Sequence, residues 1–336
     1  MPIPHLNGAF VAMLALSLIA PETTLAQSTS DLINDTKDPT TILTYGMGYG
    51  QTRHSGLRGI NLDNIGRLRP EWTYSLSDTR GQETFPLIHD GKMYVTTHAS
   101  TMALDLVTGR QIWKTLVDYS ADTPRVACCG IVNRGVALYE GKVFRTTLDA
   151  HVIALDAETG NELWRTQSID HKTGYSMTVA PMMADGVLIT GISGGEYGIR
   201  GYLEGYDPDT GVRVWRNYTI PAPGEPGSET WQDGGDAWTR GGAPTWLTGS
   251  YDPELNTVFW GTGNPSSWNA ATRPGDNLYA SSIMAGINQT ILMSLSMVVI
   301  ATWIGAEGPG ALILGAQHYV AKGQRLLGGW QFCSLR

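Results

Sequence analysis

The sequence predicts an all-β protein of the β-propeller type, because a nine-residue phrase recurs at constant spacing and because glycine and tryptophan are abundant. The 336 residues include 41 glycines and 11 tryptophans, whereas only 16% of the residues are charged. Glycine turns combined with regularly placed tryptophans are typical of repeated small sheets rather than of a helical bundle. The length fits one large domain or two ordinary ones.

The repeated phrase reads Asp-x-x-Thr-Gly-x-x-x-Trp and occurs at residues 105–113, 156–164 and 207–215. Its glycines lie 51 residues apart, and a degenerate earlier copy ends at Trp72. Asp and Thr ahead of Gly favour a tight turn, since glycine readily adopts positive φ. A period near 50 residues with several strands per repeat indicates propeller blades that stack on one another. A solenoid is the alternative architecture.

The N-terminus is predicted to be a signal peptide that covers residues 1–26. Residues 9–20 are apolar, and small residues precede a cleavage point at Gln27. His5 stands where Lys or Arg is usual, so an incorrectly assigned start or an uncleaved anchor is the alternative. We therefore expect export to the periplasm. A net charge of -8 provides no basic surface, which excludes nucleic acid as an expected partner.

Further motifs carry a resemblance to a known family. They read Gly-Gly-Ala-Pro-Thr-Trp at 241–246, Ser-Tyr-Asp-Pro-Glu-Leu-Asn at 250–256, Gly-Thr-Gly-Asn-Pro at 261–265 and Arg-Pro-Gly-Asp-Asn at 273–277. With the repeated phrase, they resemble the PQQ-dependent (quinoprotein) methanol and ethanol dehydrogenases over about residues 30–280. The resemblance implies an eight-bladed propeller, of which residues 27–282 form an incomplete part. It also implies pyrroloquinoline quinone (PQQ) with Ca²⁺ or a lanthanide, a primary alcohol substrate that is oxidised to an aldehyde, and a cytochrome c-type electron acceptor.

Cys128 and Cys129 are adjacent in the sequence. A trans peptide places their Cα atoms ~3.8 Å apart, below the ~4.4–6.8 Å usual for disulfides, so a bond between them closes a tight eight-membered ring. A reduced, buried pair is the alternative. In the family such a ring forms one face of the slot that holds the flat quinone. Trp246 matches the family's tryptophan on the opposite face, although alone it would count as one more packing residue.

Eight other residues match polar or metal-binding positions of the family. The cofactor-binding positions are matched by Glu83, Arg134, Thr178, Ser193, Gly194 and Gly195, and the metal-binding positions by Glu196 and Asn264. A carboxylate and an amide oxygen are the ligands that a hard cation such as Ca²⁺ prefers. Without the resemblance, each of these residues would be assigned to a surface or a turn.

The resemblance stops before the residue that acts as the family's catalytic base. In relatives this aspartate lies about forty residues beyond the metal-binding asparagine, but the matching window of 300–310 contains no aspartate. Asp276 matches only a structural position. We therefore assign no catalytic residue, and we expect a truncated dehydrogenase with little or no turnover. A non-catalytic partial propeller that binds PQQ or a partner is the alternative.

The C-terminal part changes in character, because residues 277–306 contain no charged side chain. Residues 283–330 resemble the permease subunit of glycine betaine/proline ABC transporters, and residues 331–336 follow as a tail. We expect an apolar helical segment there, arising by fusion, with membrane contact through residues 283–306, since about 20 apolar residues suffice to span a bilayer. A membrane-attached fusion product is thus a further alternative for the function. A pair of apolar propeller strands is the alternative structure of this segment.

Overall fold

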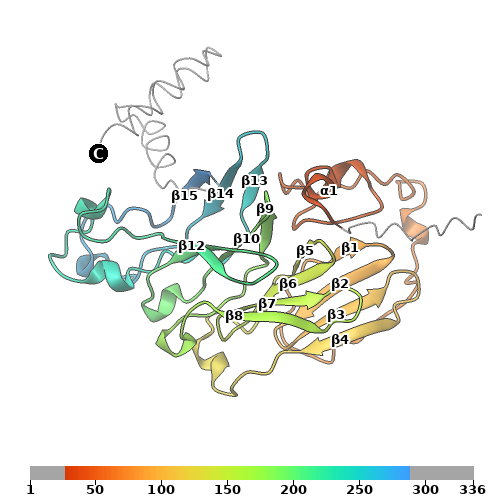
Figure 1. The fold of residues 1–336 in the computed structure, drawn as a ribbon, viewed down its shortest axis with the longest axis horizontal. Helices are drawn as coiled ribbons and strands as arrows, with labels where there is room; N and C mark the ends of the chain where they lie inside the picture. Colours follow the sequence, from red (N-terminus) through yellow and green to blue (C-terminus); the bar gives the residue numbers. More distant parts are fainter. Residues whose placement is uncertain (1–26, 288–336) are drawn as a thin grey trace, which may run out of the picture.

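The computed structural model describes residues 27–287, which form an arc of four antiparallel sheets (Figure 1). Each sheet is a meander in which every strand pairs with its neighbour in the sequence. The first sheet contains β1 (Leu87–His89), β2 (Lys92–Thr97), β3 (Ser100–Asp105) and β4 (Gln111–Leu116). The second contains β5 (Ala137–Tyr139), β6 (Lys142–Thr146), β7 (His151–Asp156) and β8 (Glu162–Gln167). The third contains β9 (Met182–Ala184), β10 (Val187–Gly191), β11 (Tyr202–Tyr206) and β12 (Arg213–Tyr218). The fourth contains β13 (Ser250–Asp252), β14 (Thr257–Gly261) and β15 (Ile283–Ile287).

Helical structure within residues 27–287 is limited to short turns. The α-helix α1 spans Thr29–Ile33, and it begins with a capping box between Ser28 and Asp31. The 3-10 turns are η1 (Asp35–Lys37), η2 (Ile65–Arg67), η3 (Thr123–Val126), η4 (His171–Thr173), η5 (Gly195–Tyr197), η6 (Ser228–Thr230), η7 (Ala237–Arg240) and η8 (Ala270–Thr272). None of the helices in this part of the chain has the length and apolar character needed to cross a membrane. These features confirm the predicted mostly-β, propeller-type fold.

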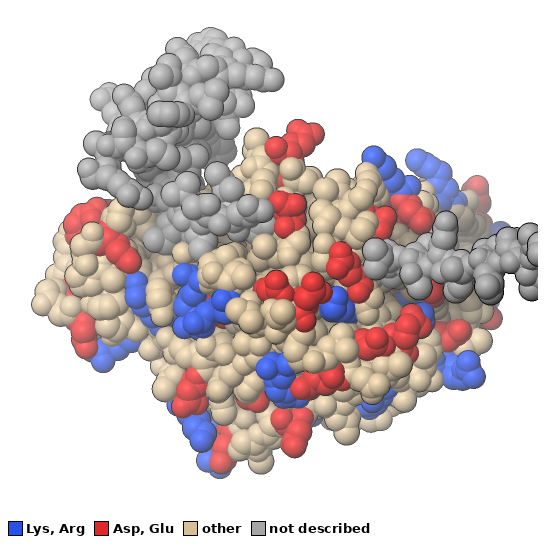
Figure 2. Space-filling view, viewed as in Figure 1, with Lys and Arg blue, Asp and Glu red and all other residues tan. Residues whose placement is uncertain are grey.

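Burial changes regularly from strand to strand within a sheet. The third strands β3, β7 and β11 are almost entirely buried, whereas the fourth strands β4, β8 and β12 expose part of their side chains. The fourth strand therefore forms the outer rim of each of the first three sheets. On the face shown in Figure 2, basic and acidic side chains are interspersed rather than gathered into one patch.

The repeated phrase joins consecutive sheets through its glycine and its tryptophan. Each glycine has positive φ, and a Cβ atom added to it would lie 2.4–2.6 Å from the tryptophan of the preceding repeat. The pairs are Gly109 with Trp72, Gly160 with Trp113, and Gly211 with Trp164. Each indole N–H donates to a carbonyl of the same turn, at 3.1, 3.0 and 3.0 Å, and the acceptors are Leu106, Ala157 and Pro208. We call each such contact a tryptophan dock. The docks confirm the prediction that consecutive repeats stack on one another. Trp72, at the end of the degenerate copy, packs on the first complete repeat in the same way.

The N-terminal segment crosses the first strands of successive sheets. Ile42 pairs with Ile88 of β1, and the Gln27 side-chain oxygen accepts a hydrogen bond from the Gly141 N–H beyond β5 at 3.2 Å. The Tyr49 hydroxyl donates to the Met183 carbonyl of β9 at 2.8 Å. These contacts tie three sheets together independently of the tryptophan docks.

The fourth sheet differs from the expected division of the chain at residue 282. β15 pairs with β14 through five residue pairs, from Ile283 opposite Gly261 to Ile287 opposite Thr257. Residues 283–287 therefore belong to the sheet and not to a helical segment. A short apolar run fits a strand or a buried helix equally well, which explains the difference. The remainder of the predicted permease-like segment and the predicted signal peptide lie outside the described residues.

Candidate cofactor site

The candidate site residues come from connections that open on one face of the arc. In an antiparallel meander, the connection into the first strand, the connection from the second to the third strand and the exit of the fourth strand lie at the same end. The connections that carry the candidates are 76–86, 117–136, 168–181, 192–201, 219–249 and 262–282. All candidates predicted from the sequence therefore emerge on this face.

Cys128 and Cys129 are joined by a disulfide, with their Cα atoms 3.8 Å apart. The pair is therefore oxidised, as predicted, and not a reduced pair of thiols. Cys129 and Gly130 have φ values of +64° and +115°, so the backbone turns sharply at the bond. Cys128 is half-buried and Cys129 is exposed, so the disulfide presents a compact sulfur surface to the solvent.

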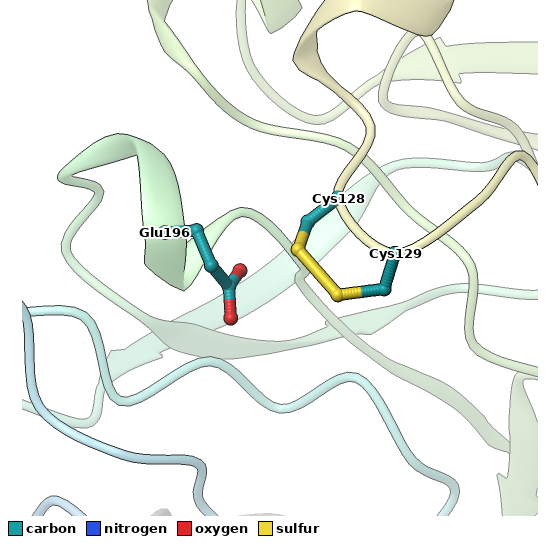
Figure 3. A group of neighbouring side chains, drawn as sticks. All are labelled: Cys128, Cys129 and Glu196. Atoms are coloured by element: carbon teal, nitrogen blue, oxygen red, sulfur yellow. A yellow bond between two sulfur atoms is a disulfide. The ribbon is translucent and has the colours of Figure 1, made fainter.

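The Glu196 carboxylate points toward this disulfide (Figure 3). The two sulfur atoms and a carboxylate oxygen of Glu196 lie within 4.8 Å of one another. Sulfur that is engaged in a disulfide is not a thiolate and is therefore a poor metal ligand. The Glu196 side chain is exposed and makes no hydrogen bond or ion pair with the described residues. A carboxylate left without a protein partner in this way suits a bound cation.

Two glycines determine where Glu196 stands. Gly194 has a φ of +115°, and a Cβ atom added there would lie 2.1 Å from the Gly174 carbonyl oxygen. A Cβ atom added to Gly195 would lie 2.8 Å from Pro244. Side chains at these two positions would collide with backbone and with a rigid ring. The close approach lets η5 present Glu196 beside the disulfide.

Asn264 is placed by the same proline. A Cβ atom added to Gly263 would lie 2.9 Å from Pro244, and the Asn264 carbonyl accepts a hydrogen bond from the Ala243 N–H at 3.0 Å. The residues just ahead of the two metal-ligand candidates, Gly195 and Gly263, thus both pack on Pro244. The Asn264 amide oxygen accepts no hydrogen bond from the described residues. An available carboxylate and an available amide oxygen form a donor set that fits Ca²⁺ or a lanthanide.

A chain of polar contacts joins four of the candidate segments. Arg134 Nη2 lies 2.6 Å from Glu83 Oε2, and Arg134 Nη1 donates to Thr178 Oγ1 at 2.6 Å. The Thr178 hydroxyl in turn lies 2.9 Å from the Ser193 hydroxyl. The guanidinium carbon of Arg134 stands 4.9 Å from the centre of the Trp246 ring. Arg134 is therefore the hub of the polar side of the site.

The Arg134 guanidinium is largely removed from water, with 12% of its side chain exposed against 45% for Glu83. Burial lowers the pKa of Arg134, while the adjacent Glu83 carboxylate raises it. An arginine stays charged at neutral pH because its ordinary pKa exceeds 12. The site therefore offers a fixed cation together with hydroxyl donors, which can hold the carboxylate and carbonyl oxygens of an anionic ligand.

We define the cofactor slot as Glu83, Cys128, Cys129, Arg134, Thr178, Ser193, Gly194, Gly195, Glu196, Trp246 and Asn264. The structure brings Glu83, Thr178, Ser193 and Trp246 together around Arg134, and Glu196 beside the disulfide, and residues 193–196 link the two groups. The approach of the Asn264 side chain to Glu196 remains a prediction. The stacking of a quinone between the disulfide and Trp246 remains a prediction.

Two positioning residues of the slot were not identified from the sequence. The buried Thr245 hydroxyl donates to the Tyr202 carbonyl at 2.6 Å and accepts from the Ile192 N–H at 2.8 Å, which fixes the loop ahead of Trp246. Asn133 donates to the Thr146 carbonyl at 2.9 Å and thereby anchors the loop that carries Arg134. Thr245 belongs to the motif at 241–246 and Asn133 directly precedes Arg134, and these are the sequence features that could have pointed to them.

The chain matches the PQQ family, described as the β-propeller domain of glucose/ethanol/alcohol dehydrogenases, over residues 43–290. It belongs to this family of PQQ-dependent dehydrogenase propellers. The resemblance inferred from the motifs is thereby confirmed.

Individual relatives agree with this assignment. The chain is 41% identical over 300 residues to the quinoprotein alcohol dehydrogenase PedH of Pseudomonas putida, covering 82% of this chain and 49% of that protein. A europium-containing methanol dehydrogenase has 37% identity and a TM-score of 0.75, covering 79% of this chain and 50% of the other. The quinohemoprotein alcohol dehydrogenase of Comamonas testosteroni has 37% identity and a TM-score of 0.76, covering 80% and 42%.

The chain spans about half the length of the curated relatives it matches. These relatives are quinoprotein dehydrogenases, and nothing in them supports the permease resemblance of residues 283–330. The family match itself continues to residue 290.

Proposed function

We propose that residues 27–287 form the PQQ- and Ca²⁺-binding half of an alcohol dehydrogenase. The observation that carries the proposal is the unpartnered Glu196 carboxylate beside the Cys128–Cys129 disulfide. An exposed carboxylate can be satisfied by water alone, so the proposal takes its support from the position of Glu196 beside the disulfide and from its match to a metal-binding position of the family. A lanthanide is the alternative metal, consistent with the similarity to a europium-containing methanol dehydrogenase.

Each part of the slot has a role in this proposal. Glu196 and Asn264 hold the metal through oxygen atoms, and Arg134 with Thr178 and Ser193 bind the polar rim of the quinone. The disulfide and the Trp246 ring provide flat or compact apolar surfaces for the two faces of the ring system. The bound quinone supplies the acceptor for two electrons and a proton equivalent, which protein side chains cannot provide.

The substrate and partners proposed here follow the family. We propose a primary alcohol as the substrate of the complete site, a cytochrome c-type acceptor for the electrons, and export to the periplasm through residues 1–26. Names of relatives include 1-butanol dehydrogenase and methanol dehydrogenase with cytochrome c, which fit an alcohol substrate.

We further propose that this chain binds the cofactor with little or no turnover of its own. An alcohol hydroxyl loses its proton during oxidation, and residues 300–310, where the resemblance places the aspartate base, contain no aspartate. Loss of a general base commonly reduces the rate by about 10²–10⁴-fold.

Reconstitution tests this proposal. The full chain is incubated with PQQ and Ca²⁺, desalted, and assayed for retained PQQ by absorbance and for ethanol-dependent dye reduction. We expect retained quinone and a rate at least 100-fold below that of a full-length relative assayed in parallel. Dye reduction at the relative's rate would overturn the claim of low turnover, and a complete loss of quinone on desalting would overturn the binding function.

A further inference from the structure

Two short segments carry the centre of the polar side of the slot, residues 133–135 and residues 177–179. They pair through a backbone hydrogen bond from the Arg134 N–H to the Thr178 carbonyl at 3.0 Å. The side chains of the same two residues meet at 2.6 Å, between Arg134 Nη1 and Thr178 Oγ1. Neither segment belongs to one of the four sheets. The spacing between Arg134 and Thr178 therefore needs support from elsewhere in the fold.

Thr146, the last residue of β6, supports both segments at once. Its carbonyl accepts a hydrogen bond from the Asn133 side-chain nitrogen at 2.9 Å, and its hydroxyl donates to the Val179 carbonyl at 2.6 Å. Thr146 and Val179 are fully buried, and Asn133 is only 3% exposed. Asn133 directly precedes Arg134 and Val179 directly follows Thr178, so each hydrogen bond ends one residue away from the slot. Because β6 is paired with β5 and β7, it gives the two loops a rigid reference.

Arg145 holds this end of β6 in place relative to the first sheet. Its Nε donates to the Thr146 carbonyl at 3.2 Å, and its Nη1 donates to the Thr101 hydroxyl of β3 at 3.0 Å. Its Nη2 donates to the carbonyls of Thr97 and His98 at 3.2 and 3.0 Å. A guanidinium is planar and its donors have fixed directions. These four hydrogen bonds therefore leave the Thr146 backbone little freedom to move.

We propose that Thr146 is a positioning residue of the cofactor slot, which fixes the spacing between Arg134 and Thr178. One of its hydrogen bonds holds the segment of Arg134, and the other holds the segment of Thr178. An anionic ligand then meets a guanidinium and a hydroxyl that are already aligned, and such preorganisation raises affinity because less ordering is needed on binding. The inference rests on the proposed function, since the anion in question is PQQ.

Hydrogen exchange in the absence of any ligand tests the positioning itself. Thr146→Val nearly keeps the size of the side chain but removes the hydroxyl, so the Val179 carbonyl loses its donor. We expect the Arg134 amide, which donates to Thr178, to exchange about 3- to 10-fold faster in this variant, as for the loss of one hydrogen bond. Mass spectrometry of the peptide that contains residues 133–135 measures the rate.

Thr190→Val is the matched control for this experiment. Thr190 is fully buried in β10, and its hydroxyl reaches only the carbonyl of the adjacent Gly191, at 3.4 Å. We expect the exchange of the Arg134 amide to stay unchanged in this variant. Equal exchange at Arg134 in Thr146→Val and Thr190→Val would overturn the proposal.

The affinity for PQQ in the presence of Ca²⁺, measured by isothermal titration, provides a second readout. We expect Thr146→Val to bind PQQ about 3- to 10-fold more weakly than the unmodified chain. Thr146→Ser keeps the hydroxyl and should restore most of the affinity. In a Thr178→Val background, the change at Thr146 should weaken binding by less than about twofold, because residues of one hydrogen-bond network do not act additively. The same loss with and without the Thr178 change would indicate a general structural effect and would overturn the proposal.

Asn133→Ala interrupts the other hydrogen bond to Thr146 and serves as the second variant if Thr146→Val does not fold. We expect it to speed the exchange of the Arg134 amide and to weaken PQQ binding in the same way. Unchanged exchange and unchanged affinity in this variant would overturn the proposal. If the unmodified chain binds no PQQ while Thr146→Val still speeds the exchange at Arg134, the proposed function is wrong and the positioning by Thr146 stands.

Discussion

The tryptophan docks and the cofactor slot are both built around glycines that accept a close neighbour, but they differ in how many parts of the chain they require. A dock needs one turn and one tryptophan from adjacent sheets, as with Gly160 and Trp113. The slot needs side chains from six connections and is linked through Arg134, Thr178 and Ser193. A dock therefore contributes mainly to stability, whereas the slot contributes mainly to ligand binding.

This difference predicts that the two regions can be damaged separately. Variants in a dock should lower the free energy of unfolding while the folded fraction still binds cofactor. Variants at Glu196 or Asn264 should reduce binding and leave the unfolding transition unchanged, because these two residues have no structural partner for their side-chain oxygens among the described residues.

The largest effect is expected for Trp164→Ala. The change removes a ring that is packed on Gly211 together with its hydrogen bond to the Pro208 carbonyl. Truncation of a packed aromatic side chain costs about 3–5 kcal/mol, and we expect the lower end because Trp164 is only partly buried. Chemical denaturation followed by circular dichroism measures the loss. Trp268→Ala, which removes a ring that is 72% exposed, is the control and should change stability by less than about 0.5 kcal/mol.

The next effect is expected for Glu196→Gln, which removes the negative charge of the proposed metal ligand while keeping its shape. We expect PQQ affinity in the presence of Ca²⁺ to fall by about 100-fold, or ~2.7 kcal/mol, with no change in the melting temperature. Fluorescence titration and thermal unfolding give the two values. Glu229→Gln changes another acidic residue in a 3-10 turn, η6, and should leave both unchanged. Equal PQQ affinities of the Glu196→Gln and Glu229→Gln variants would show that Glu196 is not a metal ligand.

The smallest effect is expected for the turn aspartates under acid. The Thr108 hydroxyl and N–H donate to Asp105, and these hydrogen bonds hold the pKa of the Asp105 carboxyl below its ordinary value of 3.8. A lowered pKa in the folded state stabilises the protein above the unfolded-state pKa, and this stabilisation is lost as the pH falls through the folded value. We expect the unfolding free energy of Asp105→Asn to depend less steeply on pH between 5 and 2. The control Asp63→Asn, whose carboxylate accepts no hydrogen bond from the described residues, should keep the unaltered slope.

The same two regions show how far the sequence could predict the structure. The docks could be predicted because one phrase repeats, and its Asp, Thr, Gly and Trp each have a local physical role. Even the isolated Trp72 was placed correctly. The strand formed by residues 283–287 at the end of the fourth sheet was not predicted, because a short apolar run has no period that distinguishes a strand from a helix.

The slot could not have been predicted from local patterns. Glu196 and Asn264 are ordinary polar residues in sequence, and only folding brings Gly195 and Gly263 onto the same proline. The resemblance to a family supplied their roles. The supporting residues Thr245 and Asn133 were missed because their hydrogen bonds reach backbone groups elsewhere in the chain, Tyr202 in one case and Thr146 in the other.

The central claim is that the connections on one face form a metal-dependent quinone slot. Isothermal titration of PQQ into the full chain, once with Ca²⁺ and once with a chelator, tests this claim most directly. The claim predicts saturable binding with Ca²⁺ and an affinity at least tenfold weaker with the chelator. Binding of equal strength under both conditions, or no binding with Ca²⁺ to a correctly folded protein, would contradict it.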